Sequence, residues 1–227
     1  MQVAHSREAT PSKLAQLLDL LRGSVHADVF TAATLAVPII SRFLDRHHGI
    51  YEVLDCQMQL ELCDTKGKVA VLDKRLQVRF AQNNIIAYQD QAWGDGAIFE
   101  DYRCRPGFLV DTYRDWHRYR VLISLRETKN RGDRDEFRIH RTIQNGITRE
   151  TEDFQVKIEH PTQHLELTIM FPRARPPRSV KLVEQNAGRS KLLAVNGIQQ
   201  LPDGRYEVRW KSSNLTLYES YIIRWEW

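Results

Sequence analysis

The sequence predicts a mainly β protein, namely an antiparallel β-sandwich of immunoglobulin-like or related type that follows two N-terminal α-helices. From Ile50 onward, apolar and polar residues alternate with a period of two, which is typical of strands that bury one face. About ten to twelve such short runs, separated by turn residues, favour a sandwich or a barrel. We therefore divide the chain into a helical segment, residues 1–49, and a sandwich domain, residues 50–227.

The run from Arg205 to Trp227 is expected to seal the core of this domain. Its aromatic and apolar residues share one parity in each of two strands: Tyr206, Val208 and Trp210, then Tyr221, Ile223, Trp225 and Trp227. Residues 212–217 between them are polar and include turn formers, so the two strands are predicted to form an antiparallel hairpin. Each large aromatic side chain can bury roughly 150–250 Å². The hairpin is therefore expected to supply much of the core.

Two earlier runs predict a long hairpin at the start of the β-region. A turn centred on Gly67 joins them, and the residues that share a face are Leu54, Cys56, Met58, Leu60 and Leu62 in the first and Leu72, Leu76, Val78 and Phe80 in the second. Arg105-Pro106-Gly107 is a strong turn signal. Further strands are expected near residues 85–89, 97–103, 116–126, 136–143, 154–159, 164–171, 179–183 and 191–195.

The N-terminal segment is predicted to form helices at about residues 11–22 and 27–47. Leucines recur at helical spacing in the first, and the second is apolar over a wide part of its surface. A surface of that width is usually covered on two sides, so we expect the helices to contact a protein partner or a second copy of the chain. The residues expected at this contact are Leu14, Leu18, Phe30, Leu35 and Ile39.

Charge and cysteine content limit the classes of partner and compartment. The net charge is +4, with 33 basic against 29 acidic residues, which permits an anionic partner without requiring one. Cys56, Cys63 and Cys104 cannot all pair within one chain, and the first nine residues lack an apolar signal core. Both features favour the cytoplasm. The longest apolar stretch, residues 29–41, is shorter than the roughly 20 residues that span a membrane.

Two arginine-rich segments are candidate ligand-binding sites. Their residues are Arg173, Arg175 and Arg178 on a proline-stiffened segment, and Arg118, Arg120 and Trp116 on a predicted strand. The first set could hold a phosphate or carboxylate at little ordering cost, and the second combines cations and a ring that could bind nucleic acid. A stiff connection between sheets and a solvated sheet face are the alternative interpretations, and we favour these.

The sequence contains none of the motifs that we can assign to catalysis or metal binding. It lacks Gly-x-Ser-x-Gly, His-Glu-x-x-His, a phosphate-binding loop and a dinucleotide fingerprint. Paired histidines and the three cysteines do not fall at zinc-ligand spacing. We therefore expect no catalytic residue, no metal and no cofactor, and we predict that the chain is not an enzyme.

The leading functional hypothesis is a non-enzymatic, cytoplasmic binding or regulatory protein that recognises a protein partner or another subunit through its N-terminal helices. The ending Tyr-x-Ile-x-Trp-x-Trp, residues 221–227, resembles the last strand of sandwich domains in accessory proteins of bacterial multi-component systems. That resemblance implies an accessory role in such a system. One alternative is a sensor of a phosphorylated ligand, a nucleotide or nucleic acid, bound by the arginines. A hydrolase with an unrecognised site is the other.

Overall fold

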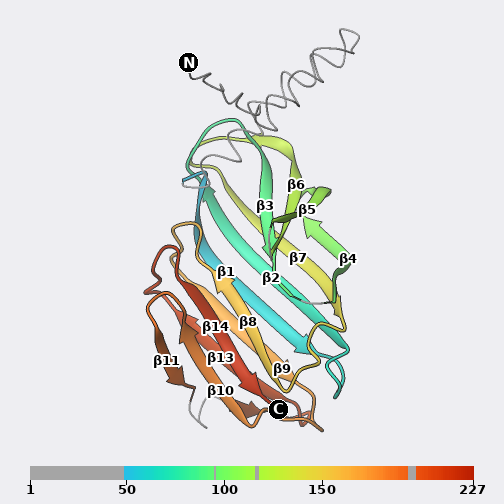
Figure 1. Cartoon of the computed structure of the whole chain (residues 1–227). Helices are drawn as coiled ribbons and strands as arrows, with labels where there is room; N and C mark the ends of the chain where they lie inside the picture. The colour runs from blue at the N-terminus through green and yellow to red at the C-terminus, as the bar shows by residue number, and fades with distance from the viewer. Residues whose placement is uncertain (1–48, 95, 116–117, 194–197) are drawn as a thin grey trace, which may run out of the picture. The chain divides into compact units, whose positions relative to one another are not determined.

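The computed structural model describes residues 49–227 apart from residues 95, 116–117 and 194–197. The helices predicted at residues 11–22 and 27–47, with the five partner-contact residues on them, lie outside the described residues, and the division of the chain after residue 49 stays a prediction. Within the described part, the strands β1 to β14 form three sheets (Figure 1). The mainly β class is thereby confirmed.

The largest sheet has seven strands in the order β12-β13-β9-β1-β2-β7-β4. In that order their bounds are Ile198–Gln200, Tyr206–Ser212, Leu165–Phe171, Tyr51–Leu62, Val69–Phe80, Arg134–Gln144 and Ala97–Arg105. Neighbouring strands are antiparallel except β1 and β9, which run parallel. This pair departs from the wholly antiparallel arrangement that the sequence predicted. Local turn residues do not encode it, because seven strands separate β1 from β9 along the chain.

Two smaller sheets complete the described part. The four-stranded sheet has the order β11-β10-β14-β8, with bounds Arg189–Leu192, Ser179–Glu184, Ser220–Glu226 and Thr151–Lys157. The three-stranded sheet has the order β3-β6-β5, with bounds Ile85–Ala92, Arg118–Lys129 and Phe108–Asp115. The turn predicted at Arg105-Pro106-Gly107 connects β4 to β5 and so links the largest sheet to this one.

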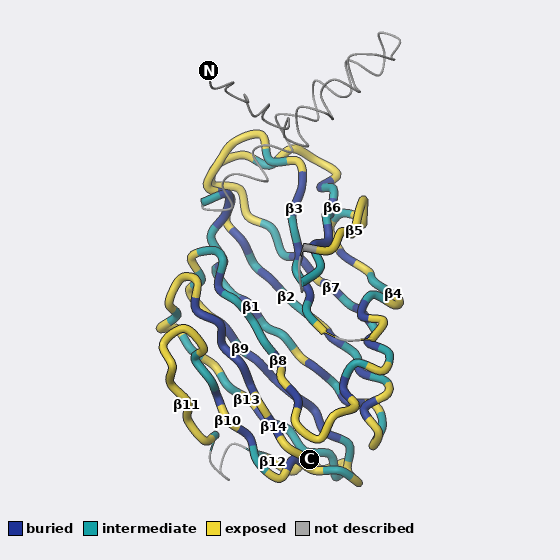
Figure 2. The backbone as a smooth tube through the Cα atoms, in the orientation of Figure 1, coloured by how far each residue is buried: buried dark blue, intermediate teal, exposed yellow. Residues whose placement is uncertain are grey.

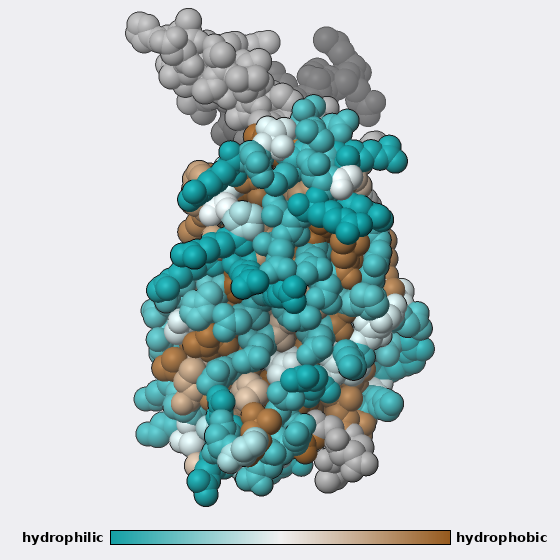
Figure 3. All heavy atoms as spheres, turned by 180° about the vertical axis from the view of Figure 1, so that it is seen from behind, coloured by the Kyte–Doolittle hydropathy of each residue, from teal (hydrophilic) through white to brown (hydrophobic). Residues whose placement is uncertain are grey.

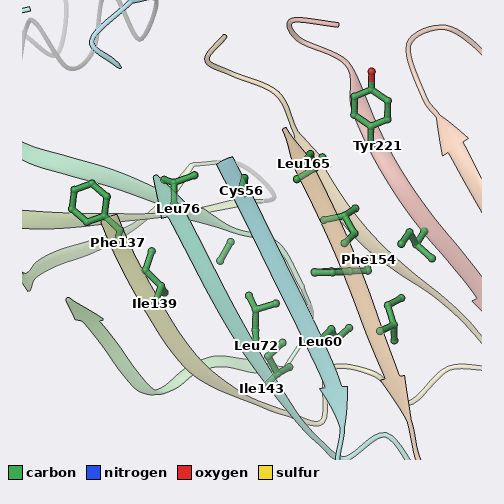
Figure 4. Packing of buried hydrophobic residues seen from close by; sticks show 14 of the residues in the cluster. Cys56, Leu60, Leu72, Leu76, Phe137, Ile139, Ile143, Phe154, Leu165 and Tyr221 are labelled. Atoms are coloured by element: carbon green, nitrogen blue, oxygen red, sulfur yellow. The ribbon is translucent and has the colours of Figure 1, made fainter. Parts of the chain in front are cut away.

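A row of inward-facing side chains runs across four strands of the largest sheet. Phe137 of β7 lies opposite Leu76 of β2, and Leu76 lies opposite Cys56 of β1. Cys56 in turn is paired with Leu165 of β9. All four residues are buried, and Figure 4 shows them across the four strands. Because every second residue of a strand points to the same face, Phe171 of β9 also lies on this face.

Both smaller sheets pack on that face. The ring of Tyr88 in β3 stacks on Phe137, with 4.4 Å between the ring centroids. The ring of Trp225 in β14 meets Phe171 edge-on, with centroids 5.7 Å apart. The core therefore lies between the seven-stranded sheet and the two smaller sheets. Three sheets do not by themselves define an immunoglobulin-like sandwich, which stays a prediction.

The predicted tryptophan-rich interior is confirmed, but the prediction that the last two strands form a hairpin is wrong. Trp225 and Trp227 are buried, and Trp210 packs against the core. Figure 2 colours the backbone by burial and shows buried residues along strands of all three sheets. However, β13 pairs with β9 in the largest sheet, whereas β14 pairs with β8 and β10. Residues 213–219 therefore cross between sheets instead of forming a hairpin turn. The reason is that β14 is a central strand, with neighbours on both sides.

The long hairpin of β1 and β2 is confirmed, with one change of facing. The backbone amides of Lys66, Lys68 and Val69 donate to the carboxylate of Asp64, which holds the turn around Gly67. A register shift between Val53 and Asp55 breaks the predicted parity at the start of β1. Val53 is buried as a result, and Leu54 is only partly buried.

The surface is largely hydrophilic on the face shown in Figure 3, with small hydrophobic areas between the polar side chains. The exposed large apolar residues include Phe108, Leu109 and Val110 of the edge strand β5. Among the described residues, no helix is long and apolar enough to cross a membrane.

Candidate ligand-binding cavity

A cavity of about 520 Å³ lies between the inner face of the seven-stranded sheet and the strands β3 and β8. Its apolar walls include Val53, Met58, Leu60, Leu72, Leu76, Ile143, Phe154, Val156 and Leu165. Figure 4 shows part of this wall, where Leu60, Leu72 and Ile143 gather on three neighbouring strands. Cavities of about 300–1,000 Å³ with mostly apolar walls and a few convergent polar groups are typical small-molecule sites.

Several charged residues line this cavity, and we call three of them, which come from β2, β3 and β7, the buried charge cluster: Lys74, Asp90 and Arg141. Lys74 of β2 lies opposite Ile139, and Arg141 of β7 lies opposite Leu72, so both share the face of the apolar row. Asp90 is on β3, which covers that face. The packing of one sheet on another therefore brings the three residues to the cavity.

Lys74 and Asp90 form a buried ion pair. The Lys74 Nζ lies 2.8 Å from Asp90 Oδ1, and the two side chains are 15% and 3% exposed. The hydroxyl of Tyr102 donates to Asp90 Oδ2 at 3.1 Å, and Lys74 Nζ donates to the hydroxyl oxygen of Tyr88 at 3.4 Å. Burial alone would lower the pKa of Lys74, but the carboxylate of Asp90 outweighs it and raises the pKa above its ordinary value. Lys74 is therefore a charged ammonium group at neutral pH.

The other titratable groups around the pair stay protonated. Burial, followed by the nearby Asp90 carboxylate, raises the pKa of Tyr102. Burial also raises the pKa of Cys56 to about 11. Because the thiolate is the nucleophilic form of cysteine, the Cys56 thiol is a poor nucleophile at neutral pH. These groups can donate hydrogen bonds or pack, and they do not add charge to the cavity.

Arg141 differs from Lys74, because no acidic residue in the described part of the chain forms an ion pair with it. It is 5% exposed, and its Nε and Nη1 atoms have no hydrogen-bond acceptor among the described residues. Its guanidinium lies 5.7 Å from the centre of the Phe99 ring. Burial lowers the pKa of Arg141, opposed by Asp90, yet an arginine stays charged in a protein. An uncompensated buried charge costs several kcal/mol, whereas a cation–π contact contributes about 0.5–2 kcal/mol. The Phe99 ring therefore does not compensate for the burial of this guanidinium.

A second ionic group lies at the end of the cavity beyond β8. Glu159 accepts from Arg118 Nη1 at 2.7 Å and from Arg120 Nη1 at 3.3 Å. The amide of Gln91 also donates to Glu159. Burial would raise the pKa of Glu159, but Arg120 and Arg118 outweigh it and hold the pKa below its ordinary value. Glu159 is therefore a carboxylate that two arginines and an amide stabilise.

The structure places the two arginines of the predicted strand set in this second ionic group. Arg118 and Arg120 come together at Glu159, while Trp116 lies outside the described residues. The expectation that Arg120 points to solvent is wrong, because its side chain is buried against Glu159. Val121 and Ile123, which share the opposite parity of this strand, are fully buried.

The arginine set predicted on the proline-stiffened segment lies between β9 and β10, where each arginine contacts a different segment. The guanidinium of Arg175 stacks 3.8 Å from the centre of the Trp227 ring, and its Nη1 donates to the Thr65 carbonyl at 2.8 Å. The Arg178 backbone amide donates to the Glu226 carbonyl at 2.7 Å. The side chain of Arg173 runs past Gly204. These contacts fix the segment to its surroundings.

Comparison with known proteins gives a loose structural likeness. No protein-family model and no curated protein matches the chain. An M1 zinc metallopeptidase from Deinococcus radiodurans matches with a TM-score of 0.46 and 8% identity, over 76% of this chain and 42% of that one. A putative protease from Parabacteroides distasonis matches with a TM-score of 0.45 and 9% identity, over 78% of this chain and 40% of that one. The chain thus spans about two fifths of the length of these structures.

This finding overturns the sequence-based prediction of a non-enzymatic binding or regulatory protein, together with its alternative of a phosphorylated-ligand sensor. The solved structures that the chain resembles are enzymes by name. The prediction that the chain is not an enzyme is likewise unconfirmed. At these TM-scores and identities, the likeness assigns neither an activity nor a metal to this chain. Among the described residues, no three His, Cys, Asp or Glu side chains are arranged to hold a metal ion.

None of Lys74, Asp90 and Arg141 was among the predicted site residues, although the sequence contains a signal for them. Each lies within an inward-facing series of its strand: Leu72-Lys74-Leu76, Tyr88-Asp90-Ala92 and Ile139-Arg141-Ile143. A buried charged residue at such a position needs an ion pair, hydrogen bonds or a bound ligand to offset the cost of its burial. That interruption of an apolar series predicts a polar cluster inside the domain.

The ionisation of Glu159 is expected to make stability depend on pH. Because its pKa is lower in the folded state than its ordinary value of 4.5, its contribution is fully present above about pH 4.5. The contribution is lost as the pH falls through the lower, folded-state pKa. Glu159→Gln is expected to cost about 1–2 kcal/mol at pH 7. Urea unfolding of both proteins from pH 7 to pH 3 should show this difference shrinking below about pH 4.5.

Glu127→Gln is the matched control, since Glu127 is an exposed residue of β6 that pairs with Lys129. Its cost should stay within about 0.5 kcal/mol at each pH. A Glu159→Gln difference that is constant over the whole pH range would contradict the assignment.

Proposed function

We propose that the domain binds a small organic molecule in its interior cavity, with the apolar part of the molecule against β1, β2 and β8. The observation that carries the proposal is the cavity of about 520 Å³ itself. Protein interiors are packed about as densely as organic crystals, so a space of this size between two packed sheets is unusual, and it opens to the surface where the exposed residues Gly94, Thr151 and Asp153 line it. Its walls combine apolar residues with many polar and charged ones, so the cavity can contact both an apolar body and a polar group of a ligand. We assign this function to the cytoplasm, because Cys56, Cys63 and Cys104 are all free.

Met58 offers the test of this proposal. It lies on β1 between Cys56 and Leu60, lines the cavity and is only partly buried, so a larger side chain can extend into the open space. The neutral dye Nile red, whose fluorescence rises in apolar surroundings, serves as the probe. Met58→Trp is expected to weaken dye binding about tenfold or more, which is about 1.4 kcal/mol.

Gln59→Trp is the control, because the adjacent residue of the same strand is exposed and points to the opposite face. This variant should bind the dye as the wild type does. Fluorescence titration of the three proteins with the dye measures this difference, and circular dichroism checks that each protein is folded. The proposal fails if the wild type does not bind the dye, or if both tryptophan variants bind it equally well.

A further inference from the structure

The unpaired guanidinium of Arg141 indicates the chemistry of the ligand. Its Nε and Nη1 donors are buried without an acceptor among the described residues, although Arg141 lines the cavity. Buried arginines in proteins normally form ion pairs or hydrogen bonds. The donors therefore point to an acceptor that the described residues do not supply.

The charges of the buried charge cluster indicate what that acceptor carries. Lys74 and Arg141 are cations, and Asp90 is an anion already bound by Lys74 and by the hydroxyl of Tyr102. One positive charge is left over within the cluster. The other charged residues of the lining balance one another, with Arg149, Lys157 and Arg224 against Glu152, Asp153 and Glu159. A buried water can accept from an N–H group, but it brings no countercharge. A single negative charge would balance the cluster, whereas a doubly charged phosphate would leave an excess of negative charge.

We propose that the cavity takes a molecule with one carboxylate and an apolar body, and that the carboxylate binds Arg141. The planar guanidinium presents paired N–H donors that match the two oxygens of a carboxylate. The apolar walls formed by residues such as Leu72 and Met58 then contact the rest of the molecule. This inference rests on the proposed function, since it names the class of molecule that the cavity binds.

Octanoate and 1-octanol form a matched pair of probes, because they share the chain length and differ in the charged group. Both are used to displace Nile red from the wild-type protein at pH 7. Octanoate is expected to displace the dye at a concentration about tenfold lower than octanol, as a charge-assisted hydrogen bond to a buried guanidinium should allow. If octanol displaces the dye as well as octanoate does, the carboxylate assignment is wrong, and the binding of Nile red still supports the cavity.

The variant Arg141→Met tests whether Arg141 causes the preference for octanoate over octanol. Methionine keeps much of the length of the side chain and removes the charge, so the variant should lose most of the preference for octanoate, measured as the ratio of the octanol and octanoate concentrations that displace the dye. It should also unfold at a higher temperature than the ligand-free wild type, because a buried charge without a partner has been removed. Arg138→Met, on the exposed side of the same strand, is the control and should keep the preference.

An Arg141→Met protein that still prefers octanoate about tenfold would overturn the role of this residue. If Arg141→Met does not fold, Arg141→Lys replaces it, since lysine keeps the charge and loses the paired donors. The preference should then be reduced but present. A preference unchanged from the wild type in Arg141→Lys would contradict the paired contact.

Discussion

Asp90→Ala is expected to destabilise the domain by about 3–5 kcal/mol, which is the usual cost of removing one partner of a buried ion pair. The carboxylate of Asp90 is 3% exposed, binds Lys74 Nζ at 2.8 Å and accepts from the Tyr102 hydroxyl at 3.1 Å. Its loss leaves Lys74 and Arg141 as two cations at one cavity. Urea unfolding at pH 7 measures the loss as a lower midpoint at an unchanged slope.

The double variant Lys74→Met with Asp90→Leu is the control for this prediction. A buried ion pair can often be replaced by apolar residues of similar volume at little cost, since the desolvation of both charges is then avoided. The double variant is therefore expected to be more stable than Asp90→Ala alone, by about 2 kcal/mol or more. If Asp90→Ala costs less than about 1 kcal/mol, or if the second substitution adds to the loss, then the pair is not buried as described.

The sequence predicted well which residues of each strand point into the core. Alternation placed Cys56, Leu60 and Leu76 on inward faces, and the structure confirms these positions. The exception at Leu54 has a local cause, because the register shift near the start of β1 changes which residue faces inward. A bulge of this kind inserts an unpaired residue and leaves no sign in the alternation that precedes it.

The pairing of strands could be predicted only where the partners are neighbours in sequence. The hairpin of β1 and β2 has its own turn at Gly67, but the parallel pair of β1 and β9 depends on contacts between distant segments. The last strand shows why the C-terminal hairpin fails. Residues Ser220 to Ile223 are buried on both parities, which is the pattern of a central strand covered on both faces.

The candidate site could be predicted only in part for the same reason. Alternation identifies Lys74, Asp90 and Arg141 as inward-facing, but it does not say that β3 covers β2 and β7. Lys74 and Asp90 come from different sheets, and their contact exists because one sheet packs on another. The arginines of residues 173–178 were a candidate ligand site because of their composition. In the structure, Arg175 stacks on the ring of Trp227.

Trp225→Ala is expected to destabilise the domain by about 3–5 kcal/mol, the usual range for removing a buried aromatic side chain. The indole is 0% exposed, and its ring lies 5.7 Å from the Phe171 ring and 6.2 Å from the Trp227 ring. Phe171 belongs to the seven-stranded sheet and Trp225 to the four-stranded sheet, so their contact joins the two sheets. The truncation leaves a cavity at this junction. Thermal and urea unfolding, followed by tryptophan fluorescence and circular dichroism, measure the loss.

Trp225→Phe separates the role of ring packing from that of hydrogen bonding. The Nε1 atom of Trp225 is buried without an acceptor among the described residues, so phenylalanine removes a donor that contributes no hydrogen bond there. Because most of the ring contact with Phe171 can be kept, the cost should stay below about 1.5 kcal/mol. Equal losses for the alanine and phenylalanine variants would show that the donor, and not the ring, matters at this position. Since β8 pairs with β14 and also lines the cavity, the alanine variant should weaken Nile red binding as well, whereas the phenylalanine variant should keep it.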